Sequence, residues 1–454
     1  MRKNNQQKIN KTVFDLINPD CAGIDIGSKV HYVCVPQDRS SEPIQKFECF
    51  TEDLAKMVKW LKECRIKSVA MESTGVYWIP VYQALEVAGF EVHLVNAKHV
   101  KNVPGRKKTD VEDCRWIQKL HSCGLITGSF RPTDQICVLR SLVRQRKRLT
   151  ECASTHVLRM QKALTEMNIQ LHNVISDITG TSGTAIIRAI LAEERDPIVL
   201  SKLVHYSLIK KQDIIAKSLC GDYRKEHLYI LKQEFELYEF YQQKIAELDQ
   251  EIDQHYKELD KKDCNDKRAL GPESKRSSAP KINIRQNLYE VIGVDLTKIP
   301  GLNELTMQTI ISEVGVDMNK WETEQHFSSW LGLSPMNKIT GEKVFKSRTN
   351  KVKNRASIAF RIAAQSVSRT QTALGAFFRR IKARAGAPKA ITATARKIAC
   401  LFYRLLKYGE DYVEQGIERY EQKYKDNLVK NMEKLAKQLG YSVIQDQEED
   451  ESVS

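Results

Sequence analysis

The stretch AGIDIGSKVHYVCV, residues 22–35, contains two short runs of β-forming residues separated by Gly27 and Ser28. Such runs on either side of a turn-forming pair predict a β-hairpin. Asp25 lies within the first strand, where burying a carboxylate is costly unless it has a partner. The stretch therefore predicts the start of a sheet and a functional acid on it.

Helix and strand patterns alternate after the hairpin. Residues 66–71 form an apolar run that predicts a strand, and Glu72 follows at its carboxyl end. Helical spacing covers 52–64 and 78–87, and a further strand is predicted over 90–96. These elements predict a layered α/β domain. Glu72 would lie at the edge where open α/β sheets bind ligands.

A helix is predicted to begin after Thr109, because Thr109 and Glu112 form the T-x-x-E capping box. Asp110 and Asp113 are three residues apart in its first turn, so they share one helical face. Carboxylate oxygens suit Mg²⁺, which keeps waters and substrate phosphates in its shell. For any one acid, the alternative is a helix-end or surface role. The four acids together favour a metal-dependent nucleic-acid site.

The segments GIDIG, MESTGVYW, KKTDVEDCRW and GLITGSFRP resemble transposases of the insertion-sequence-110 family. The amino-terminal domain of that family is RuvC-like and carries an Asp-Glu-Asp-Asp set. The resemblance implies a RuvC/RNase H-like α/β fold here, with a catalytic, Mg²⁺-binding set formed by Asp25, Glu72, Asp110 and Asp113. It continues from about residue 299 to residue 412.

The resembling family also uses a carboxy-terminal serine nucleophile, shortly after a GL-x-P motif and just before a glycine. Residues 332–335 match that motif, but the corresponding hydroxyl is Thr340, which is β-branched and more hindered. Ser347 is the rival candidate, because the adjacent Arg348 would favour the approach of a phosphate. Either hydroxyl could instead bond its own backbone.

The formal net charge of +15 indicates a polyanionic partner, since lysines and arginines release counterions when they neutralise phosphates. Basic residues concentrate in two segments, 140–148 and 343–355. The predicted nucleic-acid-binding residues are Arg144, Lys147, Arg148, Lys343, Lys346, Arg348, Lys351, Lys353 and Arg355.

The middle of the chain is predicted to be a long helical, coiled-coil insertion. Its clearest feature is a heptad ladder, formed by Leu231, Tyr238, Ile245, Ile252 and Leu259. Two interpretations remain open: a dimer-forming coiled coil, or an antiparallel helical pair within one chain.

A mainly helical carboxy-terminal domain is predicted after a polar linker. Within it, residues 296–315 have a helix-hairpin-helix-like pattern around Pro300 and Gly301, either a DNA-contacting motif or a plain helical turn. The predicted divisions are a RuvC-like domain (1–140), the helical region (141–263), a linker (264–288), the carboxy-terminal domain (289–423) and a polar, acidic-ended tail (424–454).

No run of 18 or more apolar residues occurs in the chain, and no apolar segment follows the basic amino terminus. We therefore expect no membrane association and a location in the cytoplasm of a bacterial or archaeal cell, at the nucleoid during activity. The eleven cysteines include no CxxC pair, so we expect reduced thiols rather than disulfides or a zinc site.

The sequence thus predicts a transposase or site-specific DNA recombinase. The resemblance implies DNA and an element-encoded guide (bridge) RNA as partners, and a homo-oligomer, dimer or tetramer, that assembles the site. One alternative is a RuvC-like metal-dependent endonuclease or Holliday-junction resolvase, which would not need the two hydroxyls. The other is a non-catalytic nucleic-acid-binding scaffold.

Overall fold

The computed structural model describes residues 16–73, 75–95, 109–126, 128–262, 270, 280–341, 343–350, 352 and 354–442. For residues 338, 339, 343, 344, 346, 347, 410–421, 423 and 424 it describes the backbone alone. The chain forms two compact units, residues 1–131 and 132–454. The predicted boundary at residue 140 therefore falls inside the first helix of the second unit.

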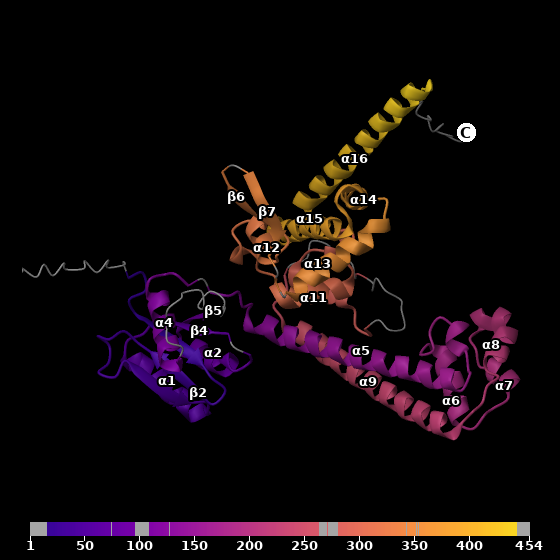
Figure 1. Cartoon of the computed structure of the whole chain (residues 1–454), viewed down its shortest axis with the longest axis horizontal. Helices are drawn as coiled ribbons and strands as arrows, with labels where there is room; N and C mark the ends of the chain where they lie inside the picture. The colour runs from indigo at the N-terminus through magenta and orange to yellow at the C-terminus, as the bar shows by residue number, and fades with distance from the viewer. Residues whose placement is uncertain are drawn as a thin grey trace, which may run out of the picture. The chain divides into compact units, whose positions relative to one another are not determined.

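The first unit contains a five-stranded sheet in the order β3-β2-β1-β4-β5 (Figure 1). β1, β2 and β3 are antiparallel, whereas β4 and β5 run parallel to β1. This mixed arrangement agrees with the predicted RuvC-like domain. The elements are β1 (Cys21–Ile26), β2 (Val30–Cys34), β3 (Ile44–Glu48), α1 (Thr51–Glu63), β4 (Ser68–Glu72), α2 (Trp78–Val87), β5 (Glu91–Val95) and α4 (Asp110–Ser122).

Helices cover both faces of this sheet. Successive side chains of a strand point to opposite faces, and side chains on both faces are buried. Ile24 and Met71 belong to a core that also contains side chains of α1 and α2. Ala70 and Val95 pack instead with Ile117 of α4. The sheet therefore has an α1/α2 face and an α4 face.

The second unit begins with two long helices, α5 (Asp134–Glu166) and α9 (Lys225–Glu258), which pack side by side (Figure 1). They are antiparallel, since Arg146 pairs with Asp249 whereas the later residue His156 contacts the earlier Glu234. Between them lie η1 (Leu171–Asn173), α6 (Thr181–Leu191), α7 (Pro197–Ser201), η2 (Tyr206–Lys211) and α8 (Gln212–Ser218).

The heptad ladder of α9 packs within the chain. Leu231, Ile245 and Ile252 are buried, and residues of α5 lie opposite them. This is the arrangement expected for the antiparallel pair within one chain. Dimerisation through this ladder stays a prediction.

The rest of the second unit is mainly helical, with one two-stranded hairpin. Its aromatic core includes Phe327, Phe360 and Phe402, with ring centroids 5.4 to 6.3 Å apart. The elements are α10 (Ile284–Ile292), η3 (Leu296–Lys298), α11 (Glu304–Val314), η4 (Met318–Lys320), α12 (Glu324–Trp330), β6 (Pro335–Thr340), β7 (Lys343–Thr349), α13 (Arg355–Ser366), η5 (Val367–Arg369), α14 (Ala373–Ala385), α15 (Ala387–Tyr408) and α16 (Glu410–Leu439).

The structure adds detail to two predicted features, the helix-hairpin-helix-like segment and the carboxy-terminal tail. The first helix of the helix-hairpin-helix-like segment is only the short turn η3. The turn at Gly301 packs on α13, where Ser366 Oγ donates to the Gly301 carbonyl over 3.2 Å. α16 crosses the predicted start of the tail at residue 424, and the acidic end of that tail lies outside the described residues. In the described part of the chain, no helix is long and apolar enough to cross a membrane.

Candidate functional site

Asp25 and Glu72 occupy matching positions on neighbouring parallel strands. Ile24 of β1 is paired with Met71 of β4, and each acid is the next residue along its strand. Side chains alternate along a strand, so Asp25 shares the face of Gly23, and Glu72 that of Ala70. Both acids therefore belong to the α4 face, at the carboxyl ends of their strands.

α4 runs antiparallel to β1 and β4. His121, near the end of α4, places its Nε2 3.0 Å from Ser68 Oγ at the start of β4. One to two turns earlier, the backbone of Cys114 and Gln118 lies against Gly23, where a Cβ atom would be 2.5 Å from the Cys114 carbonyl oxygen. The first turn of α4, with Asp110 and Asp113, therefore lies toward the carboxyl end of β1.

Thr109 fixes where this helix begins. Its Oγ1 accepts a bond from the Glu112 amide over 3.3 Å, which confirms the predicted cap. The Glu112 carboxylate pairs with Arg115 instead of completing the box, with Oε1 2.9 Å from Nη1. In the first turn of this helix, Asp110 is exposed and Asp113 is half-buried.

The Cys114 thiol lies beside these acids. Its pKa is raised by a hydrogen bond with Cys34 and by burial, and further by the negative charge of Asp25. This effect agrees with a position of Asp25 close to the first turns of α4. Among the described residues, no three histidine, cysteine, aspartate or glutamate side chains are grouped closely enough to enclose a metal ion. Mg²⁺ commonly binds through one or two carboxylates plus substrate phosphates, and the pair on β1 and β4 fits that mode.

The two candidate nucleophiles lie on the β6–β7 hairpin. Thr340 ends β6 and is exposed beside Gly341, whose φ is +54°. Ser347 is opposite Asn337 in the hairpin register, and its side chain is outside the described part. The side chains of Lys343 and Lys346, and residues Lys351 and Lys353, are also outside it, while Arg348 is exposed opposite Met336.

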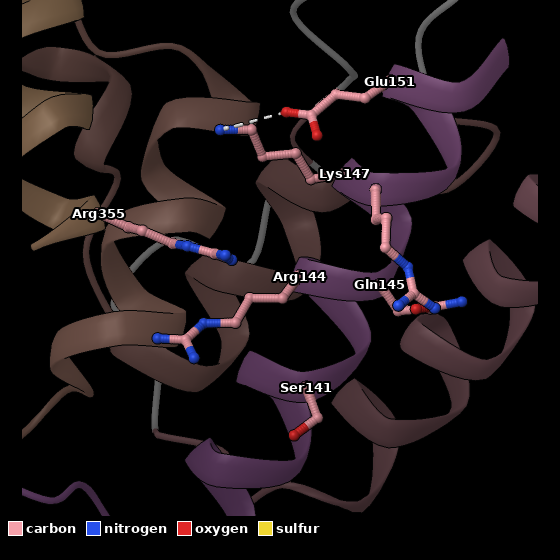
Figure 2. Close-up of a pocket in the computed structure, with 7 residues that line it drawn as sticks. Ser141, Arg144, Gln145, Lys147, Glu151 and Arg355 are labelled. Carbon is pink, nitrogen blue, oxygen red and sulfur yellow. Dashed lines mark ion pairs between the residues drawn. The ribbon is translucent and has the colours of Figure 1, made fainter. Parts of the chain in front are cut away.

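The fold brings parts of the two basic segments together. A hollow of about 450 Å³ lies between α5 and the start of α13, lined by Ser141, Arg144, Gln145, Lys147, Arg148, Glu151 and Arg355. Figure 2 shows Arg144 and Arg355 extending into it from opposite sides. Four of the nine predicted nucleic-acid-binding residues thus share one hollow.

The cations of the hollow differ in their partners. Arg144 forms two bonds, of 2.8 and 2.7 Å, with the carboxylate of Glu313, which is only 7% exposed. Lys147 Nζ lies 3.9 Å from Glu151 Oε1. Within the part of the chain that the structure describes, Arg148 and Arg355 have no acidic partner. Arg144 therefore forms a fixed wall, and Arg148 and Arg355 are the cations most available to a phosphate.

Ser141 and Gln145 were not predicted. A signal was present in the sequence, because residues 141, 144, 145 and 148 have the i, i+3, i+4, i+7 spacing of one helical face. A prediction based on charge alone includes the arginines and omits the neutral side chains between them.

Two family models match separate parts of the chain. A family model of DEDD type described as "Transposase" matches residues 22–169, which contain all four carboxylates. A second, described as "Transposase IS116/IS110/IS902 family", matches residues 295–379. The chain belongs to the IS110 family of transposases. The second match contains Thr340, Ser347 and Arg355. No curated protein matched the chain. Membership of the IS110 family gives the chain a transposase role and, with it, DNA as a partner.

Proposed function

We propose that this transposase cuts and rejoins DNA at a mobile insertion sequence, using a hydroxyl nucleophile assisted by its four carboxylates. The observation that carries the proposal is the position of Asp25 and Glu72 on adjacent strand ends, beneath the first turn of α4. Carboxylates gathered at one sheet edge suit a reaction in which negative charge develops on phosphate oxygens.

Asp25 and Glu72 are the pair that would hold Mg²⁺ together with substrate phosphates. Asp110 and Asp113, which the family resemblance adds to the set, would have to approach this pair to share the ion. When bound, the ion would stabilise the attacking and leaving oxygens of a phosphodiester exchange. The chain itself contributes the orientation of the acids. β1 and β4 fix two of them, and the Thr109 cap fixes the start of the helix that carries the other two.

Thr340 is the preferred nucleophile, because its place at an exposed hairpin tip leaves its hydroxyl open to a DNA strand. The hydroxyl oxygen would form a bond to phosphorus while one bond between phosphorus and a deoxyribose oxygen breaks. The hydroxyl proton would pass to solvent or to a nearby base. Ser347 remains the rival. The acids and these hydroxyls belong to different compact units of the chain.

The hollow between α5 and α13 is proposed to bind backbone phosphates. Arg148 and Arg355 would contact them directly, and Arg144 would line the wall. An element-encoded guide RNA would supply sequence recognition, since contacts to phosphates carry little sequence information.

The test begins with protein purified from cells that carry the whole element, with any RNA that survives a high-salt wash identified by sequencing. The protein is then incubated with element-end DNA, and covalent protein–DNA adducts are measured for Thr340→Ala, Ser347→Ala and a control, Thr349→Ala, on the same hairpin. Loss of adduct in Thr340→Ala alone supports the assignment. Loss in Ser347→Ala alone moves the role to Ser347.

An endonuclease or junction resolvase is the second candidate, because the four carboxylates lie in a unit that is compact without the hairpin. In that case water would attack the phosphodiester. The double variant Thr340→Ala/Ser347→Ala would still cut DNA, and no adduct would form with the wild-type chain.

A further inference from the structure

The carboxy-terminal helix α16 has an apolar stripe that the described chain leaves uncovered. Leu428, Met432, Leu435 and Leu439 are 42%, 51%, 59% and 67% exposed. Their spacing of three or four residues places them on one side of the helix. α16 extends away from α14 and α15 (Figure 1). This differs from α9, whose ladder is already packed against α5.

The part of α16 that carries these exposed side chains needs a partner. α16 has 30 residues, and most helical stability in proteins comes from packing an apolar face rather than from intrinsic propensity. In the sequence, the stripe continues toward the start of the helix through Val413, Ile417, Tyr420 and Tyr424. The apolar positions therefore span nearly its whole length.

The two halves of α16 have opposite charge. Residues 410–421 contain five acids and a single arginine. Residues 423–439 contain five lysines and two acids. Two parallel copies would bring like halves together, whereas two antiparallel copies would bring opposite halves together and would also oppose their helix dipoles.

We propose that α16 is a self-association element that pairs with α16 of a second copy in an antiparallel arrangement centred near Tyr424. The spacing of the stripe supports this register, because apolar positions then meet across the pair. In this register position 413 lies opposite position 435, position 417 opposite position 431, position 420 opposite position 428, and position 424 opposite its own copy.

The pairing is tested by sedimentation of the full chain after nucleic acid has been removed. The measured quantity is the mass of the protein over a range of protein concentrations. The wild-type chain is expected to dimerise. Met432→Gln/Leu435→Gln should raise the dissociation constant by at least about 100-fold, because it places polar groups in the apolar seam. Glutamine is a good helix former, so the helix itself should persist.

The matched control is Glu433→Gln/Lys434→Gln. It changes the two residues between those of the test variant, leaves the net charge unchanged and lies on the polar side of α16. It should dimerise like the wild type. A wild-type chain that is monomeric at every concentration, or a dimer unaffected by Met432→Gln/Leu435→Gln, would overturn the proposal.

The orientation is tested with a spin label on an unnatural residue at position 438, which leaves the native cysteines untouched. In an antiparallel pair centred on Tyr424, the labels should be about 42 Å apart, since 14 residues on each side rise about 1.5 Å each. A parallel pair would place them roughly 10 Å apart. The shorter distance would refute the antiparallel arrangement.

Discussion

His121 lies on α4 against the sheet, where it is 2% exposed and contacts Ser68 through Nε2. Burial, together with a smaller effect of the neighbouring His93, lowers the pKa of His121 from 6.5 to about 4. The ring centroids of the two histidines are 4.7 Å apart. The buried ring is therefore neutral in the folded chain at neutral pH.

This environment predicts a loss of stability in acid. The unfolded chain takes up a proton near pH 6.5, whereas folded His121 does so only near pH 4. The free energy of unfolding should therefore fall between these pH values, by about 3 kcal/mol from this residue. Hydrogen exchange of β4 amides should show that fall in the wild type.

His121→Gln should show a smaller fall over the same pH range, because the titrating group is gone. The control is His326→Gln, at an exposed histidine of the second unit, which should leave the pH dependence of β4 unchanged. An equally steep loss in His121→Gln would contradict the assignment to this residue.

Single residues show where local sequence patterns are sufficient and where they are not. The cap at Thr109 was predictable because it depends on atoms three residues apart. The engagement of Arg144 by Glu313 was not, because 169 positions separate the two residues and only the packing of α5 against α11 joins them. Charge in a sequence shows where cations are and does not show which are already paired.

Gly23 determines how closely α4 approaches the sheet. An added Cβ would be 2.5 Å from the Cys114 carbonyl oxygen and 2.8 Å from Gln118 Cα, both part of the rigid helix backbone. Gly23→Ala should lower the free energy of unfolding by about 1–3 kcal/mol, since the helix must shift. The shift would also move Asp110 and Asp113, so DNA cleavage should fall with stability.

Urea unfolding and a cleavage assay measure the two effects. Gly180→Ala is the control, because a Cβ there would be 3.4 Å from its nearest neighbour. It should change neither quantity appreciably. A Gly23→Ala protein with wild-type stability and cleavage would show that the close packing of α4 is not needed.

At the level of elements, periodic patterns predicted β1, β2, β4, α1, α2 and α4 well. β3 was missed, because residues 44–48 include few apolar side chains, of which Phe47 alone is buried. The ladder of α9 shows the limit of a heptad pattern. It predicts that a helix has an apolar seam but does not say whether the partner lies in the same chain.

Across the whole molecule, the basic hollow joins residues 141–151 to Arg355, more than 200 positions later in the sequence. No local pattern predicts that meeting. Arg148→Gln/Arg355→Gln should weaken nucleic-acid binding and reduce the slope of log affinity against log salt by about 2, since each phosphate contact contributes about one.

Binding is measured by fluorescence anisotropy over a range of salt concentrations. The control is Lys162→Gln/Lys232→Gln, which removes the same charge from exposed positions on α5 and α9 outside the hollow. Its salt slope should match that of the wild type. Equal slopes for the two double variants would mean that the hollow contacts no phosphates.

The central claim is that the carboxylates at the strand ends of the first unit carry the chemistry, and Glu72→Gln tests it most directly. The measurement is the rate of Mg²⁺-dependent cleavage of element-end DNA by the full chain with its RNA. Glu91→Gln is the control. Glu91 is the first residue of β5, so it lies at the amino ends of the parallel strands, whereas Glu72 lies at a carboxyl end. We predict that Glu72→Gln loses at least about 100-fold in rate, while Glu91→Gln cuts like the wild type. A folded Glu72→Gln protein that cuts at the wild-type rate would contradict the account.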